Sequence, residues 1–410
     1  CSETVSLVRM KKRTWTTAEV FTAGVEVANF GPAPIRDAVA IWSISAADGR
    51  QVAAGRLSEM TIPLGNGIQL GKIEVPLADV AAPAKLSVTV SVKGTPYLNN
   101  WDIWVYPQKL DTQAPSNILI AEQLDEQARA ALNAGGKVLL TPALNRIDSD
   151  IPPGFTTIFW NTQWTKRQPP HTLGILCDPK HPALAKFPTE FHSNWQWWDL
   201  VTKSRFMVLD EFAPEMHPIV QVIDDWNTNR KLGLLFEARV DRGKLLVCSM
   251  DLRTNLDERP VARQMLHSLL SYANSNAFAP RHKVEAGLIE GLLKKPSLLS
   301  NARVVKVDSE APLYEAANVI DANPDTIWHT AWDEGNPPAY PHEIWIDLAE
   351  SLEIKGLTYL PRQDMSNGWI SRYEVYVSAD GQDWGEPAAS GRFEKGRDRK
   401  TIAFERGTKG

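Results

Sequence analysis

The spacing of apolar residues changes twice along the chain, and these changes constrain the fold more than any other feature. In residues 1–110, apolar and polar residues alternate in several short runs, which is the pattern of strands with one buried face. Gly, Pro, Asn and Asp residues separate the runs. Turns between alternating runs predict an antiparallel β-sandwich. We expect Trp42, Trp101 and Trp104 to lie in its core.

The second block, residues 115–275, mixes short apolar runs with helical spacing. The runs at 117–122 and 137–142 enclose a helical pattern that ends at a Gly pair. A strand–helix–strand unit implies parallel pairing. Residues 232–250 predict a hairpin of buried strands, and a final helix follows with Asp257 as its N-cap.

Strand patterns return after a linker. Residues 276–300 form the linker, which contains a short amphipathic helix, and residues 301–410 again consist of short strand-like runs. The predicted fold class is therefore multidomain: an all-β sandwich of immunoglobulin type over 1–110, an α/β domain over 115–275 and an all-β domain over 301–410.

The composition excludes several classes of protein. Hydrophobic residues make up 43% and charged residues 23%, a balance that excludes disorder for most of the chain. No apolar run approaches the ~20 residues of a membrane helix. The net charge of -5 argues against a nucleic-acid partner. The 15 Trp and 28 Pro residues favour loop-rich β-structure or sugar-facing surfaces.

The three cysteines cannot build a disulfide framework. Cys248 lies in an apolar run and is expected to be buried in a strand, while a bridge from Cys177 to Cys248 remains open. No signal peptide or initiator Met precedes Cys1. The chain therefore reads as a piece of a longer protein, with a lipidated N-terminal Cys as the alternative.

Four segments of the last block occur in a characteristic order. They are residues 317–329 (ANVIDANPDTIWH), 344–348 (IWIDL), 359–364 (YLPRQD) and 373–384 (YEVYVSADGQDW). Together they resemble the signature of discoidin-type (F5/8 type C) domains, which include many carbohydrate-binding modules. The resemblance implies a discoidin-like jelly-roll sandwich over residues 301–410.

The loop at residues 321–326 places hard oxygen ligands close together. Carboxylate, carbonyl and hydroxyl oxygens suit Ca²⁺, and the resemblance implies a structural Ca²⁺ held by Asp321, Asn323 and Thr326. The alternative is a proline-stabilised turn without a metal. The family also has later closing strands with an acidic ligand, whereas only residues 405–410 remain here. We therefore expect the last domain to be truncated or to close differently.

Sugar binding requires an aromatic face for the C–H surface of the ring and planar polar groups for its hydroxyls. The resemblance implies a carbohydrate-binding rim on the segments that carry His329, Trp332, Arg362, Asn367 and Trp369. Trp328, Trp345 and Trp384 are expected to pack in the core.

The middle block resembles the glutamine-amidotransferase-like flavodoxin fold. The active version has a nucleophilic Cys on a Gly-flanked turn, and no Gly-x-Cys-x-Gly occurs here. The resemblance therefore implies a non-catalytic domain. As an alternative, its carboxylates, with Asp224 and Glu190 as the candidates, could make the fragment itself a hydrolase of a glycoside or ester.

Aromatic and amide residues concentrate in an irregular stretch of the middle block. They form either a saccharide cleft or the packing of a long insertion. The histidines at 181, 192 and 217 lack zinc-ligand spacing. The candidate secondary aromatic cluster consists of Trp160, Trp164, His171, His192, Trp195 and Trp198.

The order of the three domains resembles the C-terminal part of glycoside hydrolase family 2 enzymes of the β-galactosidase or β-glucuronidase type. This resemblance implies a non-catalytic, carbohydrate-binding and structural region whose partners are a polysaccharide or oligosaccharide and an upstream catalytic domain. It also implies a periplasmic or extracellular bacterial protein. A purely structural or oligomerising role for the middle domain is a further alternative.

Overall fold

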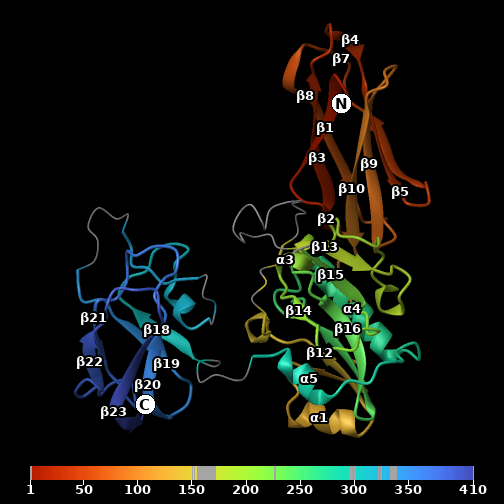
Figure 1. Ribbon diagram of the computed structural model, residues 1–410. Coiled ribbons are helices and arrows are strands. Elements are labelled where there is room, and N and C mark those ends of the chain that lie inside the picture. The colour runs from red at the N-terminus through yellow and green to blue at the C-terminus, as the bar shows by residue number, and fades with distance from the viewer. Residues whose placement is uncertain are drawn as a thin grey trace. The chain divides into compact units, whose positions relative to one another are not determined.

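The structure is a computed structural model of the 410-residue chain. It describes all residues except 1, 150, 152, 155–171, 226–227, 295–298, 300–301, 322, 324–325, 333–338 and 410, and the side chains of 405–409. The chain forms two compact units, residues 1–294 and 295–410 (Figure 1).

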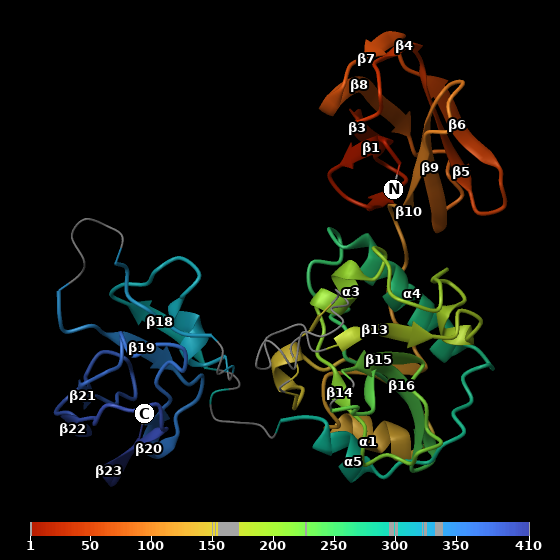
Figure 2. The ribbon, with the colours of Figure 1, turned by 45° about the horizontal axis from the view of Figure 1, so that its top comes forward.

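The first unit begins with a β-sandwich. One sheet contains β1, β3 and β8, and the other has the order β2-β10-β9-β5-β6, with a small β4-β7 pair at one end (Figure 2). The strands are β1 (Thr4–Met10), β2 (Thr14–Thr16), β3 (Val20–Asn29), β4 (Ile35–Ala38), β5 (Ala40–Ala46), β6 (Gln51–Arg56), β7 (Met60–Ile62), β8 (Gly65–Pro76), β9 (Ala84–Val92) and β10 (Leu98–Tyr106).

The alternation seen in the sequence builds the sandwich core. On β9, Leu86, Val88, Val90 and Val92 are buried at every second position, as expected for strands that expose their other face. Trp104 is also buried, but in the core of the α/β domain and not in that of the sandwich. Trp42 and Trp101 are partly buried and pack against the sandwich core.

The rest of the first unit is an α/β domain with a mixed sheet of order β11-β12-β17-β16-β15-β13, in which β14 pairs with β16. Its elements are β11 (Ile118–Ala121), α1 (Glu126–Asn133), β12 (Lys137–Leu140), η1 (Leu144–Arg146), β13 (Thr172–Cys177), η2 (Pro182–Leu184), α3 (Trp198–Thr202), β14 (Met207–Val208), β15 (Val220–Asp224), β16 (Leu232–Val240), β17 (Gly243–Cys248), α4 (Pro260–Asn274) and α5 (Ala286–Gly291).

Only part of this sheet is parallel. The predicted strand–helix–strand unit forms β11, α1 and β12, and β12 pairs in parallel with β17. The predicted hairpin forms β16 and β17, and the remaining pairs are antiparallel. Asp257 does not cap the last helix: α4 starts at Pro260 with Arg259 as its N-cap residue, because proline fixes the first helical position.

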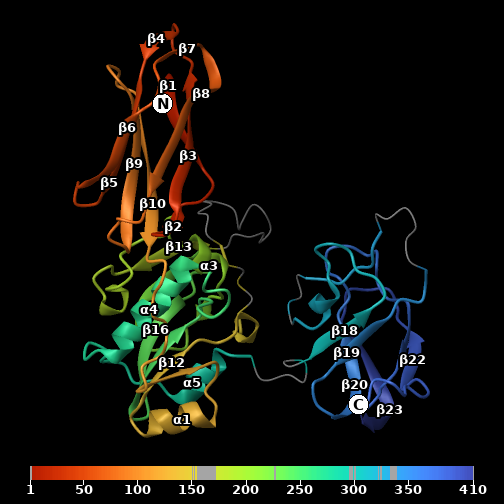
Figure 3. The same ribbon diagram turned by 180° about the vertical axis from the view of Figure 1, so that it is seen from behind.

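Both faces of the sheet are buried, which explains its continuous apolar runs. Leu139 and Leu246 point to the face that α4 covers, whereas Val138 and Leu245 point to the face that α1 and α5 cover. Figure 3 shows α4 lying along the sheet, next to the end of β10. Cys177 and Cys248 are both buried and free, so the disulfide that the sequence allowed between them does not form.

Strand β10 belongs to both cores of the first unit. Ile103 and Val105 pack in the sandwich core, whereas Trp104 and Tyr106 pack in the core of the α/β domain. Because successive strand residues point to opposite faces, one strand joins the two layers. Lys85 reinforces this joint through ion pairs with Asp102 and Glu190.

The second unit consists of short strands paired as β18-β19, β20-β23 and β21-β22. Its elements are β18 (Arg303–Val307), η3 (Ala316–Val319), β19 (Ile344–Asp347), β20 (Glu353–Tyr359), β21 (Arg372–Val375), β22 (Ala389–Arg392) and β23 (Lys400–Lys409). Trp345 and Trp384 are half-buried, with ring centroids 4.8 Å apart.

Gly243 marks a tight contact between β17 and α1. A Cβ placed there would lie 2.7 Å from Leu132 Cα and 2.8 Å from the Leu132 carbonyl oxygen. Gly243→Ala should destabilise the first unit by about 1–3 kcal/mol through overpacking. Gly287→Ala is the matched control: its Cβ would meet nothing within 4 Å on α5, so it should be neutral or stabilise the helix. Calorimetric unfolding of both variants compares them, and equal melting temperatures would contradict the prediction.

Candidate functional site

Two loops of the second unit meet at His329. The backbone N–H of His329 donates to the Tyr314 carbonyl at 3.1 Å, and its carbonyl accepts from Ala311 N–H at 2.8 Å. Gly368 lies against the imidazole ring itself, since a Cβ at this position would lie 3.2 Å from His329 Nε2. Gly368 has a φ of +79°, a conformation that glycine adopts without strain. The backbone thus fixes the position of the imidazole.

An aromatic cluster surrounds this imidazole. The Trp332 ring lies 4.6 Å from the His329 ring at 81° and 5.5 Å from the Tyr314 ring at 61°. Trp332 is nevertheless 52% exposed. His329 Nδ1 lies 2.8 Å from the Thr330 carbonyl oxygen, which can only accept. We therefore assign the proton to Nδ1, which leaves Nε2 as an acceptor.

Arg362 is held by a planar two-point contact. Its Nε and Nη2 donate to the two carboxylate oxygens of Asp364 at 2.7 and 2.6 Å. This pairing lowers the pKa of Asp364 to about 2 and raises the pKa of Arg362, to which the nearby Tyr314 also contributes. A guanidinium has five N–H donors, so donors remain for a ligand.

The structure therefore brings His329 and Trp332 together with Tyr314, and Tyr314 also interacts electrostatically with Arg362. Asn367 is exposed on the loop that carries Arg362. Trp369 is half-buried, and its indole N–H donates to the Arg362 carbonyl at 3.1 Å, so it supports that loop. Trp328 is also half-buried and donates to the Ser309 carbonyl at 2.9 Å. Sequence reasoning missed Tyr314, because it lies outside the recognised segments.

The loop proposed for Ca²⁺ is compact. The Asp321 carboxylate accepts from Asn323 N–H at 2.8 Å and from the Thr326 hydroxyl at 2.7 Å. The same hydroxyl lies 2.9 Å from the Asn323 carbonyl oxygen. Carboxylate, carbonyl and hydroxyl oxygens thus converge, and this donor set fits a hard cation. Asp321, Asn323 and Thr326 are the residues that would hold it.

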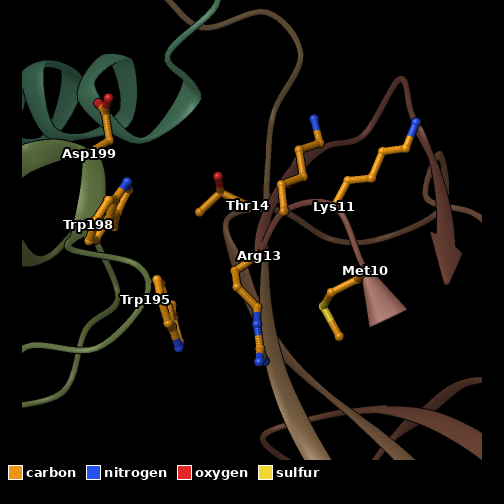
Figure 4. Close-up of a pocket in the computed structure, with 8 residues that line it drawn as sticks. Met10, Lys11, Arg13, Thr14, Trp195, Trp198 and Asp199 are labelled. Carbon is orange, nitrogen blue, oxygen red and sulfur yellow. The ribbon is translucent and has the colours of Figure 1, made fainter. Parts of the chain in front are cut away.

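A second aromatic feature lies in the first unit. Figure 4 shows two indole rings on one wall of a pocket of about 350 Å³, with Met10, Arg13 and Thr14 opposite them. Of the predicted secondary aromatic cluster, Trp195 and Trp198 lie together at this pocket. His192 is exposed and contacts Phe191. Trp160, Trp164 and His171 fall outside the described residues.

The pKa values of the candidate catalytic groups in the middle domain are shifted in the direction opposite to that which catalysis requires. Burial acts to raise the pKa of Asp224, but hydrogen bonds from Arg230 and Thr228 outweigh it and the pKa is lowered. The hydrogen bond from Lys85 likewise lowers the pKa of Glu190. A general acid needs the opposite shift. Burial raises the pKa of Cys177 to about 11 and that of Cys248 to about 12, so neither thiol is an activated nucleophile.

The part of the chain that the structure describes lacks two further features. No group of three or more His, Cys, Asp or Glu side chains there is arranged to hold a metal ion. Within the same residues, no helix has both the length and the apolar character needed to cross a membrane.

The comparisons with known families agree with the organisation of the chain. Residues 304–410 match the F5/8 type C domain. Residues 19–107 and 119–294 match two families described as domains of unknown function, DUF8488 and DUF8487. The chain is therefore a multidomain, mostly β protein that carries an F5/8 type C domain at its C-terminal end.

Several known proteins share part of this sequence. A galactose oxidase from Gibberella zeae is 37% identical over 157 residues, which cover 35% of this chain and 23% of that protein. A sialidase from Micromonospora viridifaciens is 46% identical over 101 residues, which cover 23% of this chain and 16% of that protein. The chain thus spans less than a quarter of the length of either relative.

A solved structure also resembles part of the chain. It is described as CpGH89CBM32-5 from Clostridium perfringens in complex with GalNAc-beta-1,3-galactose. The likeness has 33% identity and a TM-score of 0.25, and it covers 27% of this chain and 79% of that chain.

Trp332 and Trp369 should differ in their effect on stability. Trp332→Ala removes a half-exposed ring and should change the melting temperature of the second unit little. Trp369→Ala removes a half-buried ring and its hydrogen bond, and should cost about 1–3 kcal/mol. Thermal unfolding of both variants tests this. If Trp332→Ala unfolds the unit, Trp332 is a core residue and not part of a rim.

Proposed function

We propose that the second unit binds a galactose-configured sugar at the rim formed by His329, Trp332 and Arg362. The observation that carries the proposal is the contact of the exposed Trp332 indole with the His329 imidazole, whose Nε2 is an acceptor. Arg362, which interacts electrostatically with Tyr314 of the same cluster, would supply the guanidinium donor. Galactose has an axial 4-hydroxyl, which leaves a continuous C–H face at C3, C4 and C5. The indole would cover that face while His329 and Arg362 bind the hydroxyls.

The family match supports carbohydrate binding as the function of this unit. The sequence relatives are, by their names, a galactose oxidase and a sialidase, both enzymes that act on sugars. Trp332 is 52% exposed, whereas the Arg362 side chain is only 10% exposed. The site would therefore cover one face of a sugar and bind it weakly, with a dissociation constant between micromolar and millimolar. Asn367 and Trp369 would complete the rim from the loop that carries Arg362.

We further propose that the chain is an accessory region of a larger glycan-degrading enzyme, resembling the C-terminal part of glycoside hydrolase family 2 proteins, in the periplasm or outside the cell. The order of its three domains supports this assignment. The inert cysteines and ion-paired carboxylates of the middle domain support a structural, amidotransferase-like domain without its own catalysis.

Titration calorimetry of the 410-residue chain with galactose and N-acetylgalactosamine tests the binding site. Trp332→Ala should weaken binding by about 1–2 kcal/mol, the scale of one aromatic contact. His329→Ala should cost about 1 kcal/mol through one lost hydrogen bond.

Tyr340→Ala is the control for these variants. Tyr340 is an exposed aromatic residue of the same unit whose ring contacts His342, so its loss should leave binding unchanged. If the parent protein binds neither sugar, or if Trp332→Ala and His329→Ala bind as well as the parent, the proposed site is wrong.

A structural Ca²⁺ in the loop at Asp321 would stabilise the second unit by mass action. Adding Ca²⁺ should raise its melting temperature and chelation should lower it. Asp321→Asn should abolish this response. Asp380→Asn makes the same change in another tight loop, where Asp380 accepts from two backbone N–H groups, and should retain the response. A melting temperature that is insensitive to Ca²⁺ would show that the loop is a turn without a metal.

A further inference from the structure

The pocket between the sandwich and the α/β domain of the first unit has two unlike walls. One wall consists of Trp195 and Trp198, whose ring centroids are 5.7 Å apart and whose planes are tilted by 43°. These rings are 49% and 45% exposed. The other wall is the connection from β1 to β2, which presents Lys11, Lys12 and Arg13. The pocket volume of about 350 Å³ lies within the range of small-ligand sites.

The aromatic wall is held by its neighbours. Trp197, between the two exposed tryptophans, is fully buried and donates to the Thr189 hydroxyl at 2.8 Å. Asp199 follows Trp198 and binds the buried Arg259 through Nε at 2.9 Å and Lys203 at 3.2 Å. These contacts fix the start of α3, so the indole wall is preorganised, which lowers the entropic cost of binding.

The opposite wall carries positive charge. Arg13 is fixed by a hydrogen bond from Nη1 to the Asp102 carbonyl at 3.0 Å. Lys12 pairs with Glu19, whereas Lys11 forms no ion pair within the part of the chain that the structure describes. Asp199 is the acid that lines the pocket, and Arg259 and Lys203 already neutralise it. Asp102 interacts electrostatically with Arg13, and Lys85 forms an ion pair with this carboxylate. A local excess of cations on a chain of net charge -5 favours an anionic ligand.

We propose that this pocket is a second glycan site, which binds an anionic oligosaccharide. Each indole face provides a platform for the C–H face of one sugar ring, and the tilt between them suits consecutive rings along a chain. The remaining donors of Arg13 bind the carboxylate or sulfate group, for which a guanidinium is well shaped, and Lys11 on the same connection adds positive charge to this wall.

Calorimetry of the 410-residue chain tests the proposal with trigalacturonate, a sulfated galacto-oligosaccharide and neutral galactotriose. The uronate should bind, and raising the salt concentration should weaken it because the contact is partly ionic. Galactotriose lacks the charge and should bind at least fivefold more weakly at this pocket. Comparison of the uronate with the sulfated ligand identifies which anion the pocket prefers.

Variants assign the binding to this pocket. Trp195→Ala and Trp198→Ala should each weaken uronate binding at least fivefold. If the alanine variants do not fold, Trp195→Phe and Trp198→Phe replace them, because each keeps an aromatic ring at its position. Lys11→Gln should weaken binding and reduce its salt dependence. Lys72→Gln removes the same charge from an exposed position of the same sandwich. It should therefore change neither the affinity for the uronate nor the salt dependence of binding.

The second unit provides the control that separates the two sites. Trp332→Ala should leave uronate binding intact even where it abolishes galactose binding. The proposal is overturned if neither anionic ligand binds, if galactotriose binds equally well in the pocket, or if the Trp195, Trp198 and Lys11 variants bind the uronate like the parent.

Discussion

The first unit depends on the two faces of β10. Its alternate residues enter different cores, with Ile103 and Val105 in the sandwich and Trp104 and Tyr106 in the α/β domain. Neither core is complete without this strand, so the sandwich and the α/β domain constrain each other directly rather than through a linker. The pocket at Trp195 follows from the same constraint, because its walls come from the two layers that β10 holds together.

The sequence predicted the strands well where the burial of one or both strand faces alone determines the pattern of apolar residues. Alternation in β9 and the apolar runs of β12 and β17 each reflect whether one or both faces are buried. It predicted the sheet of the α/β domain less well, because a strand–helix–strand unit fixes only its own pairing. The antiparallel strands β13, β15 and β16 join by tertiary packing that no local pattern records.

The candidate sites differ in how far they could be predicted. His329 and Arg362 lie in segments with a recognisable order, and the structure places the His329 ring against the Trp332 ring. Tyr314 lies before those segments and joins the cluster through its ring contact with Trp332 and the backbone bond to His329. Trp195 and Trp198 stood out by composition, but the lysines opposite them come from the start of the chain, and only the folded structure shows that pairing.

The buried cysteines have a consequence for the handling of the protein under oxidising conditions. With a pKa of about 11, fewer than about one in a thousand Cys177 side chains carries the thiolate at neutral pH, and Cys248 is still less ionised. Disulfide exchange proceeds through the thiolate. These two residues should therefore stay unmodified in air, without a reducing agent, for as long as the first unit stays folded. Reactive thiol at Cys177 or Cys248, as distinct from Cys1, would report that the α/β core has opened.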